Sequence, residues 1–150
     1  MSQKLLILLF FLGTFFAKSQ SLFWNTSVVD AIELSNSQRK PLLIFFTASG
    51  TSDKIQNEIF KSPDFASWSA KNVILVKLDF SDANVSPEQK EQNNSLRTAF
   101  GIDEFPQVCY ATASARKGKT NFNSLGKIAY KDGVGIKAWI NESNSILNPE

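Results

Sequence analysis

The sequence predicts an α/β fold in which helices flank a central mixed β-sheet. Two apolar runs, at residues 42–47 and 73–79, are almost unbroken, which is typical of strands buried on both faces. Helices predicted between the early strands make parallel neighbours of them, whereas a short turn joins two later strands, at 107–112 and 122–130, as an antiparallel pair. An amphipathic helix over 136–147 closes the chain. Such an alternation builds a sheet covered by helices.

Start signals place the other helices. Three helices begin at a serine that suits an N-cap, and a proline follows two of these residues at the first helical position. The three serines are Ser27, Ser62 and Ser86. A further helix is expected from Thr51 or Ser52, which we expect to cap it. The helix after Ser86 is polar in its first half, so only Leu96, Ala99 and Phe100 are expected to pack.

The first 19 residues match a secretion signal. Lys4 precedes an apolar run at residues 5–17, and the small residues Ala17 and Ser19 suit a cleavage site. The run is shorter than the roughly 20 apolar residues of a membrane span. The alternative is an uncleaved anchor. We expect cleavage after Ser19, which leaves one domain over 20–150.

Composition excludes several classes of function. Once Lys4 and Lys18 are removed with the signal, 14 basic and 14 acidic residues remain, which gives no electrostatic attraction to nucleic acid or to an anionic membrane. Cys109 is the only cysteine, and the chain has no histidine. Zinc or copper sites and Ser–His or Cys–His nucleophile pairs are therefore excluded. We expect no cofactor, no metal and no catalytic residue.

Four segments resemble the thioredoxin-like family, in particular secreted bacterial members. They are KPLLIFFT at 40–47, VKLD at 76–79, GIDEFP at 101–106, and a closing part with Asn121-Phe122, Leu125-Gly126, Tyr130 and Trp139. Their order and spacing cover almost all of the chain after the signal. The resemblance implies a thioredoxin-like fold for residues 20–150 and a periplasmic or secreted location.

The chain departs from the family where its C-x-x-C pair would stand. SDKIQNEIF at 52–60 is similar to the segment that follows the second cysteine, with Ser52 in its place, and about two residues are missing before it. The turn is reduced to Ser49-Gly50-Thr51-Ser52. Thiol–disulfide exchange requires an attacking thiolate and a resolving thiol. We therefore expect no dithiol redox catalysis, and a protein that is not an enzyme.

Two features near the missing pair leave alternatives open. The resemblance implies a cis-proline at Phe105–Pro106, bordering a groove for an extended peptide. The alternative is that this bond is only an inherited structural bend. Cys109 lies in the predicted strand after it and is expected to be a small buried hydrophobe, although it could instead act as a reactive lone thiol.

The sequence thus favours a peptide- or protein-binding module whose partner is an extended peptide or an envelope protein. A thiol oxidoreductase that acts through Cys109, and a degenerate structural paralogue, are the alternatives. No membrane contact is expected after signal cleavage. The candidate binding residues, at the former active-site groove, are Gly50, Thr51, Ser52, Phe105 and Pro106.

Overall fold

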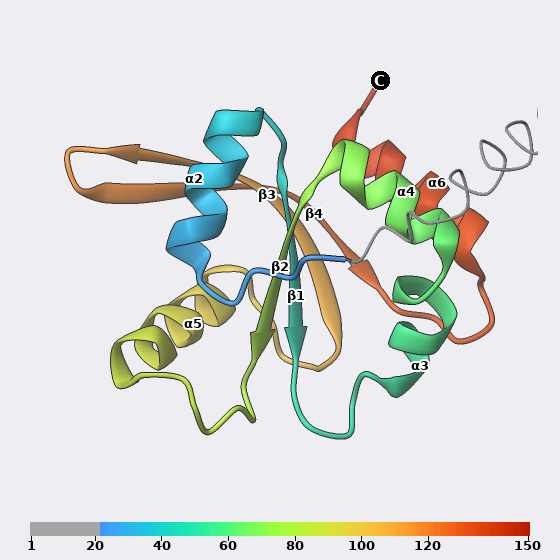
Figure 1. The fold of residues 1–150 in the computed structure, drawn as a ribbon, viewed down its shortest axis with the longest axis horizontal. Helices are drawn as coiled ribbons and strands as arrows, with labels where there is room; N and C mark the ends of the chain where they lie inside the picture. The colour runs from blue at the N-terminus through green and yellow to red at the C-terminus, as the bar shows by residue number, and fades with distance from the viewer. Residues whose placement is uncertain (1–21) are drawn as a thin grey trace, which may run out of the picture.

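The computed structural model describes residues 22–150 and shows helices on both faces of a four-stranded sheet (Figure 1). The expected signal peptide, residues 1–19, lies outside the described residues. Among the described residues, no helix is long and apolar enough to cross a membrane. The elements in chain order are α2 (Val28–Gln38), β1 (Leu42–Thr47), α3 (Asp53–Ile55), the π-helical η1 (Gln56–Phe60), α4 (Pro63–Asn72), β2 (Ile74–Asp79), α5 (Pro87–Ala99), β3 (Gln107–Arg116), β4 (Lys119–Ala129) and α6 (Ile136–Leu147).

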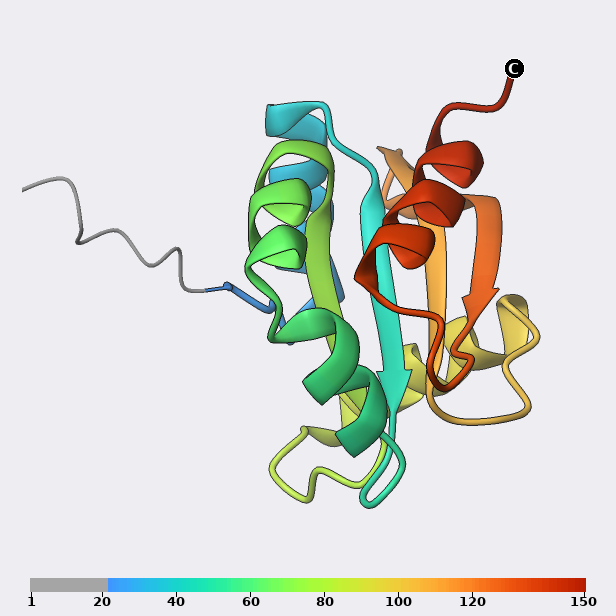
Figure 2. The same cartoon turned by 90° about the vertical axis from the view of Figure 1, so that its right-hand side faces the viewer.

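The sheet is mixed, as the sequence predicted. Its strand order is β2-β1-β3-β4, with β1 parallel to β2 and antiparallel to β3. Thr47 lies opposite Asp79, and Phe46 lies opposite Gln107. The carboxyl ends of β1 and β2 therefore meet the amino end of β3 at one end of the sheet. The loops that follow β1 and β2, and the loop that precedes β3, gather at that end (Figures 1 and 2).

Both faces of the sheet are covered because β1 is apolar at every position but its last. Ile44 and Phe46 pack under α2 and α5, whereas Leu43 and Phe45 pack under α3, η1, α4 and α6. Figure 1 shows the two groups of helices on opposite sides of the sheet. The second face is rich in aromatic rings, with Phe60 4.8 Å from Phe45 between centroids. Helices on both faces of the sheet thus follow from an unbroken apolar central strand.

All three predicted serine caps are formed. The hydroxyl oxygens of Ser27, Ser62 and Ser86 accept hydrogen bonds from the backbone N–H groups three residues later, at 3.4, 3.1 and 3.2 Å. The side chain of Gln89 does not form a hydrogen bond back to Ser86. It donates to the Thr26 carbonyl at 2.9 Å and so ties α5 to the segment before α2.

Three expectations about local structure were wrong or incomplete. Ala99 is exposed, and Asn93 is buried on the packed face of α5. The hairpin strands reach Arg116 and Lys119, well beyond their predicted ends. The prediction stopped short because most of the outer residues are exposed, and Ala113 is the one that is buried there. Lys117 and Gly118 both have positive φ in the two-residue turn between the strands, the arrangement that suits the twist of a hairpin.

Candidate functional site

The turn after β1 is closed by its own threonine. Thr51 Oγ1 donates to the Ala48 carbonyl at 2.7 Å and accepts from the Ala48 N–H at 3.3 Å. Ser52 stands at the N-cap position of α3, but its side chain makes no capping hydrogen bond. The expectation that Thr51 and Ser52 cap the helix is therefore wrong, because the shortened turn draws Thr51 back onto Ala48 and leaves the Ser52 hydroxyl without a bond to the helix.

The loop after β2 supports this turn. The Ser49 N–H donates to Ser81 Oγ at 2.8 Å, and the Ser81 hydroxyl donates to Asp79 Oδ1 at 2.6 Å. The Ser81 N–H donates to the same carboxylate oxygen at 2.9 Å. The Ser81 hydroxyl, aided by its N–H, holds the pKa of Asp79 below its usual value, against the opposing effect of burial. An ionised Asp79 thus anchors the serine on which the turn rests.

The bond between Phe105 and Pro106 is cis and immediately precedes β3. Since Phe46 in β1 faces Gln107 in β3, this bond lies at the same end of the sheet as the turn. We call the five candidate residues at this end, Gly50, Thr51, Ser52, Phe105 and Pro106, the turn-and-proline site. Thr51, Ser52, Phe105 and Pro106 are partly exposed, and Gly50 is exposed.

Aromatic and cationic side chains adjoin this site. The Phe105 ring stacks on Phe80 with 5.2 Å between centroids. The guanidinium carbon of Arg97, from the last turn of α5, lies 4.8 Å from the centre of the Phe105 ring. Sequence reasoning missed both neighbours, because Phe80 and Arg97 come from elements separated from Phe105 in the chain and form no motif with it.

Cys109 lies away from the surface. It sits in β3 between Ile44 of β1 and Lys127 of β4, and its exposed fraction is 0%. Burial raises the pKa of the thiol to about 12, although the charge of Lys127 opposes this shift. A protonated, enclosed thiol is a poor nucleophile. The expectation that Cys109 is a buried hydrophobe agrees with these positions.

A second polar cluster joins the segment after the turn to the loop before α6. Glu58 of η1 accepts hydrogen bonds from the Tyr130 hydroxyl and from the Gly135 N–H, the latter at 2.8 Å. Nearby, Lys54 pairs with Asp132 at 3.0 Å, with both side chains well exposed. The sequence offered no signal for this cluster beyond a pair of glycines, Gly133 and Gly135, in the loop that receives Glu58.

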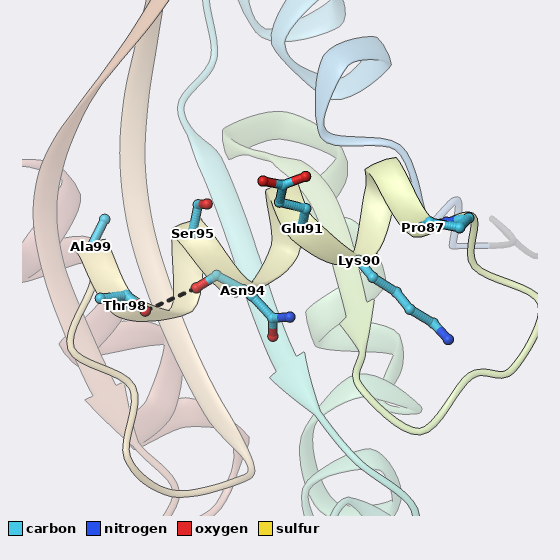
Figure 3. Close-up of a pocket in the computed structure, with 7 residues that line it drawn as sticks. All are labelled: Pro87, Lys90, Glu91, Asn94, Ser95, Thr98 and Ala99. Carbon is cyan, nitrogen blue, oxygen red and sulfur yellow. Dashed lines mark hydrogen bonds between the residues drawn. The ribbon is translucent and has the colours of Figure 1, made fainter.

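Two hollows in the surface lie away from this site. The one drawn in Figure 3, of about 760 Å³, is lined only by residues of α5, among them Lys90 and Glu91. A second, of about 460 Å³, lies between α2, α5 and β4. Neither includes a residue of the turn-and-proline site. Among residues 22–150, no three His, Cys, Asp or Glu side chains come together as a metal site would require.

Comparison with known proteins agrees with this architecture. No protein-family model matches the sequence. The disulfide bond reductase DsbH of Chlamydia pneumoniae is 29% identical over 125 residues, which cover 81% of this chain and 70% of DsbH. The thioredoxin-related protein DsbJ of the same organism is 28% identical over 92 residues, 59% of this chain but only 26% of DsbJ.

Solved structures give the same result. The structure of the DsbH oxidoreductase has a TM-score of 0.69 and 26% identity, with 87% of each chain covered. A thioredoxin from Thermus thermophilus has a TM-score of 0.62 at 9% identity, covering 84% of this chain and 87% of its own. The chain therefore has a thioredoxin-like fold and is similar in sequence to DsbH and DsbJ.

These similarities correct one expectation. We expected a protein that is not an enzyme, because the thiol pair is missing. The relative that aligns with 81% of the chain is named a disulfide bond reductase, and this contradicts that expectation, although the chain has one cysteine. The expectation rested on the missing cysteine pair alone.

Proposed function

We propose that the protein is an exported, oxidoreductase-related protein that binds an extended polypeptide segment at the turn-and-proline site. The observation that carries this proposal is the pairing of Phe46 in β1 with Gln107 in β3, which puts Phe105 and Pro106 at the end of the sheet where the turn after β1 lies. Ligands of open α/β sheets bind at the carboxyl ends of the parallel strands, which is where the turn lies. Similarity to a disulfide bond reductase supports a role in disulfide chemistry.

The backbone of Phe105 is suited to an extended partner. Within residues 22–150, its N–H and C=O groups take part in no backbone hydrogen bond outside the regular elements, and β3 begins only at Gln107. Extended peptides commonly bind by adding main-chain hydrogen bonds to such free groups, while side chains provide specificity. A bound segment would then run past Pro106 toward Thr51.

The reacting sulfur atoms would come from a cysteine of the bound polypeptide and from the disulfide with which that cysteine exchanges. In thiol–disulfide exchange a thiolate attacks one sulfur of a disulfide, one S–S bond forms, another breaks, and a thiolate leaves. This chain would contribute by holding a segment extended with its cysteine accessible, since correct positioning alone lowers a reaction barrier. The alternative route through Cys109 is favoured by no observation, because that thiol has no exposed surface.

Export to the periplasm or the exterior completes the proposal. It is supported by the apolar N-terminal pattern and is consistent with similarity to the Dsb proteins. Cleavage after Ser19 would give a chain that starts at Gln20. Mass spectrometry of the native protein tests this, and a terminus at Met1 or Ser2 would exclude cleavage.

Binding can be tested with a neutral model peptide. The probe is a heptapeptide with an acetylated amino end and an amidated carboxyl end. Threonine and valine alternate along it, except that asparagine stands at its third and fifth positions. In a nitrogen-15 NMR titration of the mature protein, we expect shifts at the amides of Thr51, Gly101 and Phe105. Shifts confined to other parts of the molecule, or none, would refute the proposed site.

Two arginine substitutions separate the site from the rest of the surface. Ser52 makes no capping bond, so Ser52→Arg adds bulk and charge at the site without removing one. Ser114 is exposed in β3, far along the strand from Pro106, and Ser114→Arg adds the same group there. We expect only Ser52→Arg to weaken the peptide-induced shifts. Equal effects of both variants would count against the turn-and-proline site.

A further inference from the structure

Three aromatic rings form a column that ends at the turn-and-proline site. Phe46, buried in β1, stacks on Phe80 with 6.2 Å between centroids, and Phe80 stacks on Phe105 at 5.2 Å. Arg97 covers the outer two rings, with its guanidinium carbon 4.8 Å from Phe105 and 5.7 Å from Phe80. A guanidinium stacked on rings in this way keeps its edge free for hydrogen bonds.

A hydrogen bond also fixes the Arg97 guanidinium at one edge. Arg97 Nε donates to the Ile102 carbonyl at 3.1 Å, which fixes the plane of the group and leaves the N–H donors of its two terminal nitrogens. Within the described part of the chain, the only ion pair is Lys54 with Asp132. Arg97 therefore has no carboxylate partner within 4.0 Å among these residues, although Asp103 and Glu104 follow in the next loop.

A second cation touches the same loop. Lys127 of β4 donates through Nζ to the Gly101 carbonyl at 3.2 Å and is otherwise exposed. Arg97 and Lys127 thus approach residues 101 and 102 from different elements, four to five residues before Pro106. A polypeptide bound along Phe105 would pass close to Arg97, whose ring contact is with Phe105 itself.

We propose that Arg97, stacked on Phe105, makes the turn-and-proline site selective for polypeptide segments that carry a carboxylate side chain. This inference rests on the proposed function, since it requires a segment bound at that site. Planar guanidinium groups recognise carboxylates through two parallel hydrogen bonds. Lys127 adds a second positive charge next to Gly101, which favours the same ligand chemistry.

The test compares two peptides on one protein. The first is the neutral heptapeptide described above, and the second carries aspartate in place of its two asparagines. For a partly exposed pair of charges, we expect the aspartate peptide to bind the wild-type protein about 5-fold more tightly. Equal affinities would overturn the inference and leave the proposed function intact, whereas a failure of both peptides to bind would overturn both.

Variants assign the preference to Arg97. In Arg97→Gln we expect the two peptides to bind equally, while Arg97→Lys keeps the charge, loses the planar pair of donors, and keeps only part of the preference. Lys90→Gln is the matched control, because it removes the same charge from an exposed position on the same helix. A preference that persists in Arg97→Gln, or disappears in Lys90→Gln, would overturn the assignment. Because the wild-type comparison needs no variant, it tests the inference even if Arg97→Gln is poorly folded.

Discussion

The hydroxyl of Tyr130 donates a hydrogen bond to the carboxylate of Glu58, a residue 72 positions earlier in the chain. The same carboxylate accepts from the N–H groups of Gly133 and Gly135. Since Glu58 lies in η1, directly after the turn and α3, these bonds tie the segment that follows the candidate site to the loop that leads into α6. The cluster thus restrains the segment next to the turn-and-proline site, although none of its own residues belongs to that site.

The first prediction concerns this cluster. The Tyr130 hydrogen bond, followed by that from Gly135, lowers the pKa of Glu58 below its usual 4.5. A lowered folded-state pKa stabilises the fold above pH 4.5, and this stabilisation is lost as pH falls through the folded value. We expect Tyr130→Phe to lower the Tm near neutral pH, with a difference from wild type that shrinks as pH falls below 4.5. Thermal unfolding followed by circular dichroism measures this.

At alkaline pH the same hydrogen bond makes stability fall, not rise, with increasing pH. The hydrogen bond to Glu58 raises the pKa of Tyr130 above its usual 10.0, so its contribution is present below pH 10 and is lost as pH rises further. Glu58→Gln should remove most of the pH dependence, and Glu33→Gln, at an exposed position of α2, should leave it unchanged. A Tyr130→Phe effect that is constant from acid to alkaline pH would show that the bond contributes little.

The cluster also shows where sequence reasoning stops. Caps such as Ser62 and the apolar run of β1 are local patterns, and both were predicted because the residues that determine them are neighbours in the chain. Glu58 and Tyr130 lie in segments that resemble the family, but they meet only through the fold, and no local pattern predicts their contact. The stack of Arg97 on Phe105 escaped prediction for the same reason.

The sequence named the residues of the candidate site but not the contacts of their side chains. The order of the strands placed the turn opposite Phe105–Pro106, and the register of Phe46 with Gln107 puts them at one end of the sheet. Whether the Thr51 hydroxyl caps the helix or closes the turn depends on the exact path of a shortened loop, which spacing alone does not define. The outer hairpin was underpredicted because exposed strand residues such as 119–121 lack an apolar face.

The second prediction tests how the turn is held. Thr51→Val keeps the shape of the side chain but removes its hydrogen bonds with Ala48, and we expect a loss of about 1 kcal/mol in the free energy of unfolding. Thr51→Ser keeps the hydroxyl and serves as the control. Urea unfolding measures stability, and faster hydrogen exchange at the Ala48 N–H would report the loosened turn. If valine is as stable as wild type, the hydroxyl is not what closes the turn.

The third prediction concerns the contact between β4 and α6. A Cβ added at Gly126, whose φ is 155°, would lie 2.9 Å from Cγ2 of Ile146. We expect Gly126→Ala to lower the free energy of unfolding by roughly 1–3 kcal/mol through overpacking and backbone strain. Ile146→Ala removes the clashing methyl, so Gly126→Ala should cost less in that background, as a double-mutant cycle would show.

Gly118 provides the control for a positive φ without a clash. Its φ is 75°, and an added Cβ would meet nothing within 4 Å. Gly118→Ala therefore reports the cost of a positive φ alone. If Gly126→Ala costs the same with Ile146 present or absent, the close approach of α6 to β4 is not the cause.

The last prediction concerns Cys109, on which the alternative function depends. With its pKa raised to about 12, roughly one thiol in ten thousand is ionised at pH 8, and the side chain has no exposed surface. We expect a water-soluble maleimide to label the folded protein only after denaturant is added.

The raised pKa also means that the buried thiol stabilises the fold below pH 9.0, its usual value, and that this contribution is lost as pH rises above it. Cys109→Ala should therefore unfold with a weaker dependence on pH in that range, and should bind the neutral heptapeptide as the wild type does, because Cys109 lies in the core of β3. Rapid labelling of the folded wild type, together with loss of binding in Cys109→Ala, would instead favour a thiol oxidoreductase that acts through Cys109.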